Sequence, residues 1–353
     1  MDLNNLILFF TLSSFGFFFY KYFILILNKH YTTLLTDDHF DKPQAFHESA
    51  TSVAGGIGIF FSFLIVYFYF LLFKNIIFLE YLTFCTLIFF IGLTDDLKIN
   101  VKAKTRLALM IILLVALIEY NNFYIENTGL EILDNWIENS KIFSLIFICL
   151  CFLFIINGAN LIDGFNGLLG IHTLIIISNL FIVNYITGNQ DLAFLLLCGI
   201  IIITMFLKYN FPKPKIFLGD SGAYFLGAFV AISVIKTSIA NPSISPFYFC
   251  ILLFYLFFEV FFSFIRKISV EKKSPLFPDN KHLHMLIYHI LNKKINNKLK
   301  SNCYVSIIIN TIYLLLIIPT IPMMTNGLFC KYYSLLFFLV YILSYKILRK
   351  KTP

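Results

Sequence analysis

The sequence predicts an all-α polytopic integral membrane protein, and its composition gives the first reasons. The chain is 59% hydrophobic and only 13% charged, whereas an average soluble domain is roughly 25% charged. Its mean hydropathy is +0.85. A soluble domain of 353 residues could not bury that much apolar surface in one core, so lipid is the expected solvent.

The third reason is that apolar stretches of membrane-spanning length recur along the chain. Eleven come near the ~20 residues that a spanning helix needs. The first is too long, and its start too uncharged, for a cleaved signal peptide, so we expect a retained helix. No repeat or linker divides the chain, which predicts one transmembrane domain over 1–353 with a cytoplasmic loop at about 266–301. The predicted spans are 4–28, 52–73, 75–94, 105–121, 141–157, 167–187, 191–208, 222–240, 245–265, 303–321 and 328–347.

Cationic residues predict the orientation of these spans. With the N-terminus outside, 22 lysines and arginines fall on inner segments and 4 on outer ones, while Lys21 lies within the first span. The outer loop 122–140 carries four acidic residues instead. We therefore expect the N-terminus outside and the C-terminus in the cytoplasm, in the inner (cytoplasmic) membrane. This bias also explains the net charge of +8 without nucleic acid as a partner.

Four polar clusters stand out, and all four fall on the inner side. Charged groups at the edge of a bilayer are costly and are commonly functional. The first cluster ends the third span with Asp95 and Asp96, followed by basic residues that include Lys104. Two adjacent carboxylates suit a hard divalent cation such as Mg²⁺, and the lysines suit phosphate or lipid headgroups. A solvated helix end with internal ion pairs is the alternative.

The second cluster, at 157–168, contains Asn160, Asp163 and Asn166, which recur every three residues. One helical turn would place them on one face. Three glycines in the same segment would let backbone approach a ligand closely. A Gly-rich turn between helices explains the glycines, but it does not explain a carboxylate among apolar neighbours. The cluster therefore favours function.

The third cluster opens the eighth span, where Gly219 is followed by Asp220. Asp220 is either a plain N-cap or a metal-carrying carboxylate at a helix N-terminus, which is a ready phosphate site.

The fourth cluster, at 275–284, includes Lys281, His282 and His284. In an extended segment the two imidazoles would project the same way, and both can bind a phosphate or uracil. Two titrating loop histidines are the alternative.

These four clusters, in this order and on one side, resemble the polyprenyl-phosphate N-acetylhexosamine-1-phosphate transferases of glycosyltransferase family 4. That family includes enzymes that initiate O-antigen, teichoic-acid linkage and peptidoglycan synthesis. The resemblance covers about residues 41–284, and eleven spans fit the N-acetylglucosamine branch. It implies transfer of a sugar-1-phosphate from a UDP-sugar to polyprenyl (undecaprenyl) phosphate, with release of UMP and initiation of a cell-envelope glycan such as the O-antigen of lipopolysaccharide or the cell wall.

The resemblance also implies roles for single residues. Asp95 and Asp96 match the family's Asp-Asp motif, Asn160 and Asp163 its Asn-x-x-Asp-Gly motif, Asp220 its metal ligand, and His282 and His284 its nucleotide-sugar loop. The expected site is then catalytic Asp95, Asp96 and Asp163, metal-binding Asp220 and Asp95, and substrate-binding Asn160, Asn166, Lys104, Lys281, His282 and His284. The implied cofactor is Mg²⁺, or Mn²⁺ in its place. The implied partners are the two substrates and the bilayer, with a homodimer left open.

The chain departs from the family pattern at four places. Asn166 stands where a second aspartate is usual, Asn280 where an arginine is common, and Met285 where a third histidine occurs. The N-terminal Arg-Lys-x-His stretch of the family is reduced to Phe46-His47. The sequence His282-Leu283-His284 argues against the peptidoglycan branch, which carries three adjacent histidines. A membrane transporter or lipid flippase is the rival function, but it predicts charges near the bilayer midplane rather than at one edge.

Overall fold

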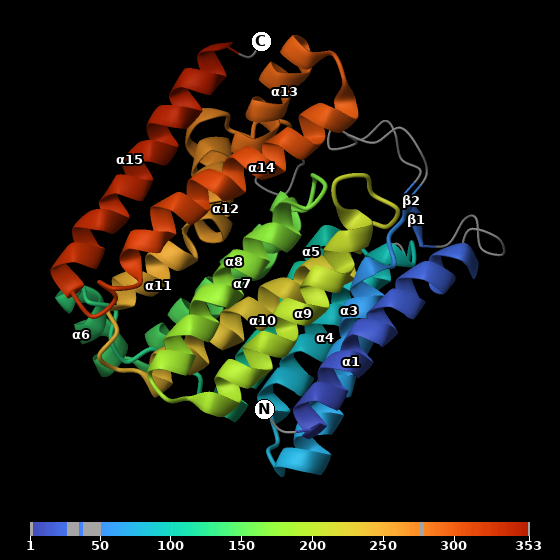
Figure 1. Ribbon diagram of the computed structural model, residues 1–353. Helices are drawn as coiled ribbons and strands as arrows, with labels where there is room; N and C mark the ends of the chain where they lie inside the picture. Colours follow the sequence, from blue (N-terminus) through green and yellow to red (C-terminus); the bar gives the residue numbers. More distant parts are fainter. Residues whose placement is uncertain (1–2, 27–34, 38–50, 100, 275–278, 352–353) are drawn as a thin grey trace.

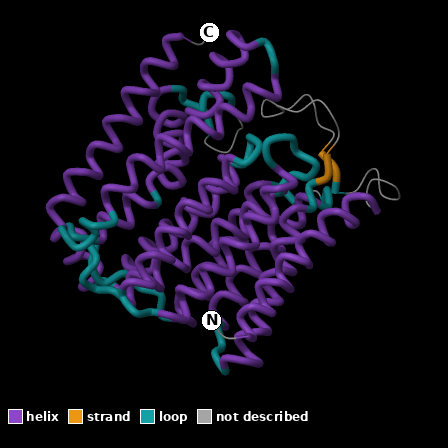
Figure 2. The backbone as a smooth tube through the Cα atoms, viewed as in Figure 1, coloured by secondary structure: helices purple, strands orange, loops and turns teal. Residues whose placement is uncertain are grey.

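Helices make up almost all of the structure. The computed structural model describes residues 3–26, 35–37, 51–99, 101–274 and 279–351. Within these ranges the strands are confined to one short antiparallel pair, β1 (Thr36–Asp37) and β2 (Thr51–Ser52), at one end of the helix bundle (Figure 2). α1 begins at one end of the bundle and α15 ends at the other (Figure 1). The predicted fold class, an all-α polytopic membrane protein, is confirmed.

A helix or a broken helix occupies each of the eleven predicted spans. Within the described residues, two further helices lie outside these spans, α6 (Glu131–Asn139) and α13 (Leu283–Ile295). The helices of the predicted spans are α1 (Leu3–Phe18) with η1 (Phe19–Phe23), α3 (Gly55–Tyr69) with η2 (Phe70–Lys74), α4 (Leu79–Asp96), α5 (Ala103–Asn121), α7 (Lys141–Ile162), α8 (Leu168–Ile186), α9 (Gln190–Asn210), α10 (Gly219–Ala240), α11 (Pro246–Leu252) with α12 (Phe254–Ile265) and η3 (Arg266–Val270), α14 (Lys298–Ile317) with η4 (Ile318–Thr320), and α15 (Gly327–Lys351).

Fewer of these helices are long and apolar enough to cross a membrane than the eleven spans that the sequence predicts. Eight helices in the described ranges are long and apolar enough, or nine if the pair α11–α12, bent by 75°, is one broken span. α4 and α5 are not in this set, because each carries charged side chains in its first and last turns. In α4 these include Asp95 and Asp96 of the first polar cluster. The number eleven stays a prediction.

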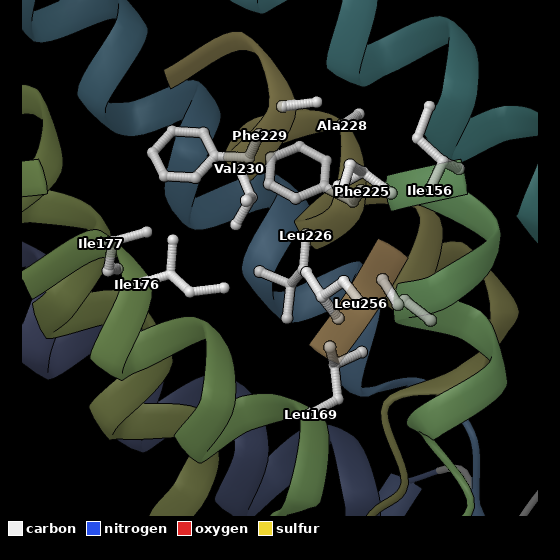
Figure 3. Packing of buried hydrophobic residues seen from close by; sticks show 14 of the residues in the cluster. Ile156, Leu169, Ile176, Ile177, Phe225, Leu226, Ala228, Phe229, Val230 and Leu256 are labelled. Atoms are coloured by element: carbon white, nitrogen blue, oxygen red, sulfur yellow. The ribbon is translucent and has the colours of Figure 1, made fainter. Parts of the chain in front are cut away.

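α10 is the central helix of the bundle. Its residues from Ser221 to Ile235 are all buried, and it packs against α3, α4, α7 and α8. Figure 3 shows Phe225, Leu226 and Phe229 of α10 among side chains of α7 and α8. A helix that is apolar on every side is covered either by lipid or by other helices, and here neighbouring helices cover α10. Its first turn is therefore held in place by the helices around it.

Glycines let two neighbouring helices approach α10 at backbone distance. A Cβ on Gly56 of α3 would lie 2.4 Å from the Cα of Gly222, and a Cβ on Gly92 of α4 would lie 2.5 Å from the carbonyl oxygen of Asp220. Small residues permit such packing between membrane helices. The ends of α3 and α4 are thus brought against the first turn of α10.

The segment that leads into α10 is fixed by backbone hydrogen bonds. The Phe217 N–H donates to the Ser52 carbonyl at 2.7 Å. The Gly55 and Gly56 N–H groups, at the start of α3, donate to the Phe217 and Leu218 carbonyls at 2.9 and 2.7 Å. These bonds satisfy N–H groups that a helix start leaves without partners. They also set where α10 begins, at Gly219, one residue before Asp220.

Candidate active site

Four helix ends converge on a group of polar side chains that we call the acid site: Asp95, Asp96, Arg106, Asn160, Asp163 and Asp220. The Arg106 Nη1 of α5 lies 2.9 Å from Asp95 Oδ2 and 3.1 Å from Asp220 Oδ2. The Asn160 Nδ2 of α7 donates to Asp220 Oδ1 at 2.9 Å. Asp220 is thus held from two sides by helices that lie far apart in the sequence.

Asp95 and Asp96 are neighbours in the sequence but have different environments. Asp96 accepts the backbone N–H groups of Asp220 at 2.8 Å and Ser221 at 3.0 Å, so it caps α10 from a different helix. A carboxylate is favoured there by the free N–H groups and by the helix dipole. Gly219 precedes these donors with φ +79°, and a Cβ on it would lie 2.8 Å from Asp96 Oδ2. Asp96 is 9% exposed, whereas the Asp95 side chain is 43% exposed.

Asp163 follows the last residue of α7 and is half-buried. Among the described residues, no side chain donates a hydrogen bond to its carboxylate. Burial, together with the charges of Asp220 and Asp96, raises the pKa of the Asp163 carboxyl well above its usual value. An acid in this state gives up its proton reluctantly and is a good base once ionised, which suits proton transfer.

The acid site has the donor chemistry that Mg²⁺ prefers. Asp95 and Asp220 are partly exposed carboxylates that share a single cation, the Arg106 guanidinium. Hard oxygen ligands and phosphate co-ligands are typical of Mg²⁺ sites in enzymes that bind nucleotides. Within the described part of the chain, no three His, Cys, Asp or Glu side chains are close enough together to hold a metal ion by themselves. The residues therefore fit a metal held by Asp220 and Asp95 with substrate phosphates as further ligands.

Arg106 is the cation of this site, although Lys104 was the predicted substrate ligand. Lys104 is exposed, and no hydrogen bond or ion pair joins it to the acid site in the part of the chain that the structure describes. Both residues lie in the first turn of α5, two positions apart, so they face different sides of the helix. The sequence identified the basic segment but could not tell which member faces the acids.

The predicted helical face of Asn160, Asp163 and Asn166 is wrong, because α7 ends at Ile162. Asn166 is 6% exposed, and its backbone N–H donates to Asn302 Oδ1 of α14 at 2.8 Å. Its side-chain amide faces the Pro212 carbonyl. These contacts brace the turn between α7 and α8, and none of them reaches the acid site. Asn166 as a substrate ligand stays a prediction.

A second group, which we call the histidine site, consists of Tyr255, Glu259, His282, His284 and Tyr341. His282 Nδ1 lies 3.1 Å from Glu259 Oε1, and His284 Nδ1 lies 3.2 Å from the Tyr255 hydroxyl. Tyr341 donates to Glu259 Oε2 at 2.6 Å. Glu259 was not among the predicted site residues, although a lone acid inside an apolar span is a signal of a functional group.

The two histidines lie at the start of a helix rather than within the extended segment considered from the sequence. His282 is the residue before α13, His284 lies in its first turn, and they are 2% and 0% exposed. Their rings are nonetheless parallel, with 4° between the planes and 5.5 Å between the centroids. Burial lowers the pKa of His284 to about 3, so its ring is neutral.

Charged residues around the histidines pair with one another. Asp279 contacts Arg266 at 2.9 Å and Lys267 at 3.3 Å, and Lys281 contacts Glu271 at 2.7 Å. Although burial opposes it, the Lys281 N–H and the nearby cationic groups lower the pKa of Asp279 to about 2. The predicted ligand Lys281 thus has a protein partner. Residues 275–278 of the fourth cluster lie outside the described residues.

The acid and histidine sites meet at the end of α7. Phe165, two residues after Asp163, places its ring 5.6 Å from the His284 ring and 5.5 Å from Tyr288 of α13. Further back along α7, a Cβ on Gly158 would lie 2.1 Å from the Leu256 carbonyl oxygen, so α7 and α12 touch through their backbones. The two sites are therefore close enough for a single extended ligand to contact both.

Comparison with known proteins matches this architecture to one family. The model of glycosyl transferase family 4 matches residues 78–238, which contain every acidic residue of the acid site. The chain is 30% identical over 259 residues to undecaprenyl-phosphate alpha-N-acetylglucosaminyl 1-phosphate transferase of Thermotoga maritima, covering 72% of this chain and 73% of that protein. It is 32% identical over 241 residues to phospho-N-acetylmuramoyl-pentapeptide-transferase of Dictyoglomus turgidum, covering 65% of this chain and 74% of that protein.

Proposed function

Because this chain belongs to glycosyl transferase family 4, we propose that it transfers an N-acetylhexosamine-1-phosphate from a UDP-sugar to undecaprenyl phosphate. The chain is a multi-pass membrane phosphotransferase. The observation that carries the specific proposal is the acid site, at the ends of four helices, in which Asp95 and Asp220 pair with Arg106 and the charge of Asp220 acts on Asp163. Two phosphate-bearing substrates need a place where carboxylates, a cation and partial exposure coincide.

The proposed reaction is a displacement at the sugar-linked phosphorus of the UDP-sugar. An oxygen of the lipid phosphate forms a new bond to that phosphorus, while the bond to the bridging oxygen breaks and UMP leaves with the electron pair. Both reactants are anions, so positioning and neutralisation of charge provide most of the rate enhancement. Arg106 is the protein cation that can meet the phosphates, since it lies between Asp95 and Asp220.

Asp163 is the proposed base for a lipid phosphate that arrives protonated. It has no donor in the described residues to satisfy it, and its raised pKa favours taking up that proton. Asn160 orients Asp220 through a 2.9 Å hydrogen bond. Asp220 and Asp95 would hold a bound Mg²⁺ or Mn²⁺, which would neutralise charge on the diphosphate.

The histidine site is the proposed place of the nucleotide part of the donor. His282 and His284 lie next to the acid site through Phe165, so one extended UDP-sugar can contact both. The donor is proposed to be an N-acetylhexosamine nucleotide, in line with the Thermotoga maritima relative. The product would then initiate a cell-envelope glycan such as an O-antigen.

The reaction is proposed to take place on the cytoplasmic side of the inner membrane, where most of the lysines and arginines are expected. Single cysteines at Asn280 and Asn127, in a cysteine-free background, test this side by accessibility labelling. Labelling of Asn280 only from the cytoplasm and of Asn127 only from outside is expected. The reverse pattern would contradict the assignment.

The central experiment is UMP release by the purified protein. Undecaprenyl phosphate is offered with UDP-N-acetylglucosamine, other UDP-N-acetylhexosamines or UDP-N-acetylmuramoyl-pentapeptide. Release of UMP with an N-acetylhexosamine donor, together with a lipid-linked sugar product, supports the proposal. Release only with the muramoyl-pentapeptide donor would move the chain to the peptidoglycan branch. Lipid translocation in vesicles without UMP release would instead favour the flippase rival.

A further inference from the structure

The two histidines are each anchored through one ring nitrogen and leave the other uncommitted. His282 Nδ1 contacts Glu259, and His284 Nδ1 contacts the Tyr255 hydroxyl. His282 Nε2 lies 3.5 Å from Asp279 Oδ1, which is longer than the 2.7–3.2 Å of an ordinary hydrogen bond. His284 Nε2 is fully buried and has no hydrogen-bond partner in the described residues. Buried polar atoms normally have a partner, so two open nitrogens on parallel rings point to a ligand.

Glu259 is the anchor of His282, and its own surroundings fix its role. Three groups donate to its carboxylate: His282 Nδ1–H at 3.1 Å, the Leu283 N–H at 3.0 Å and the Tyr341 O–H at 2.6 Å. Glu259 is 1% exposed. An ionised carboxylate only accepts hydrogen bonds, so it matches three donors and places a hydrogen on His282 Nδ1. A glutamine at this position would place its NH₂ group, which cannot accept a hydrogen bond, opposite at least one of these donors.

Tyr255 fixes His284 in a comparable way. The hydroxyl of this buried tyrosine has no other hydrogen-bond partner among the described residues, so its O–H donates to His284 Nδ1. The neutral His284 ring then carries its single hydrogen on Nε2, the atom without a partner. The two anchors therefore present Nε2 of both rings to a ligand.

We propose that Glu259 and Tyr255 are positioning residues that orient the Nε2 atoms of His282 and His284 toward the nucleotide part of the UDP-sugar, with Tyr341 of α15 holding Glu259 in place. Neither anchor needs to touch the substrate. This inference deepens the proposed function and rests on it, because it assigns the same donor to the histidine site. It also gives α15, which is outside the matched family region, a part in substrate binding.

The test measures UDP binding by titration calorimetry on the full-length protein in detergent, and then the KM for UDP-sugar, the KM for undecaprenyl phosphate and kcat. Glu259→Gln should weaken UDP binding roughly tenfold to a hundredfold, because a charge-assisted hydrogen bond to His282 is lost. Tyr341→Phe and Tyr255→Phe each remove one hydroxyl and should weaken it roughly twofold to tenfold. The KM for UDP-sugar should rise in parallel, while the KM for undecaprenyl phosphate and kcat should change much less.

Tyr345→Phe is the matched control. Tyr345 lies one turn beyond Tyr341 on α15, is also buried, and packs its ring on Phe262 at 4.7 Å. No hydrogen bond of its hydroxyl is found in the described residues. This variant should keep UDP affinity within roughly a factor of two. An equal loss in Tyr345→Phe and Tyr341→Phe would overturn the inference, as would unchanged UDP affinity in Glu259→Gln and Tyr255→Phe.

The design keeps this inference separate from the proposed function. UMP release by the unchanged protein decides the function, whereas UDP binding by the variants decides the positioning roles. If Glu259→Gln does not fold, the two tyrosine variants carry the test, because each loses a single oxygen atom from a packed ring. Loss of kcat alone, with UDP affinity unchanged, would assign the histidine site to the chemical step and overturn the inference.

Discussion

The acid site and the histidine site hold charge in opposite ways. In the acid site, Asp95 and Asp220 have side chains that are 43% and 32% exposed, and they share one guanidinium. In the histidine site, Glu259 is 1% exposed and accepts three hydrogen bonds. Partial solvation of Asp95 and Asp220 suits the proposed exchange of partners with a phosphate, because a fully paired buried charge is costly to separate. The burial and full pairing of Glu259 suit its proposed role of holding a fixed geometry.

The comparison also separates what each site is expected to control. The acid site contains the carboxylates and the cation that can meet the reacting phosphates, so its variants should lower kcat. The histidine site fixes the orientation of two rings, so its variants should raise the KM for the UDP-sugar.

Asp220→Ala should reduce turnover on the order of a thousandfold, because it removes the carboxylate that Arg106 and Asn160 hold in place. Excess EDTA should have the same effect if Asp220 carries a divalent cation. UMP release measures both. Glu131→Ala removes an exposed carboxylate from α6, at the other end of the bundle, and is the control. Full turnover in EDTA would contradict the metal prediction.

Gly92→Ala should lower kcat on the order of a hundredfold, since a small misplacement of reacting groups has effects of this size. Its Cβ would lie 2.5 Å from the Asp220 carbonyl oxygen, and backbone cannot yield as a flexible side chain can. UDP binding at the histidine site should persist. Gly327→Ala is the control, because its Cβ would meet only Ser245 Oγ at 3.9 Å. Equal kcat in the two variants would show that the close approach of α4 to α10 is not needed for catalysis.

His282→Ala should raise the KM for the UDP-sugar roughly tenfold to a hundredfold, because a hydrogen bond to a charged group is lost. The KM for undecaprenyl phosphate should change little. Asp95→Asn should do the opposite and lower kcat at saturating concentrations of both substrates. Steady-state kinetics with each substrate varied in turn measures both effects. If the histidine variant lost only kcat, the division between the two sites would be wrong.

Arg106→Ala should lower activity roughly tenfold, because Asp95 and Asp220 lose the cation that they share. Lys104→Ala removes a cation from the same helix turn and is the matched control. It should change activity by less than roughly twofold, since Lys104 is exposed and makes no described contact with the acids. A larger effect of Lys104→Ala would show that the lysine, not the arginine, meets the substrate phosphate.

Asp163→Asn should raise the melting temperature by roughly a few degrees at neutral pH while lowering kcat. The pKa of Asp163 is raised in the folded protein, so its ionisation destabilises the fold, and stability is lost as pH rises through that raised pKa. The variant removes this loss. Melting from about pH 4 to about pH 8 should show a gap that is small in acid, where the unchanged protein carries a neutral Asp163, and that widens with pH. A constant gap would mean that burial of the charge is not the cause.

The sequence alone predicts much of the acid site, because the residues that carry its chemistry occur in short local motifs. Asp95, Asp96 and Asp220 were expected at helix ends and Asn160 in the segment between two spans, and hydrogen bonds and ion pairs join them in the structure. Their separate roles were not predictable. Asp96 is a cap on α10 and Asp95 a partner of Arg106, and only the approach of α4 to α10 distinguishes two adjacent aspartates.

Local sequence patterns are enough to predict the membrane fold and the polar clusters, because apolar length, charge bias and local motifs are properties of neighbouring residues. Helix packing, by contrast, establishes which cation faces the acids, where α7 ends before Asn166, and that Glu259 anchors His282. Those contacts join residues on different helices. Their partners depend on how α7, α10, α12 and α15 pack, and no local pattern encodes that packing.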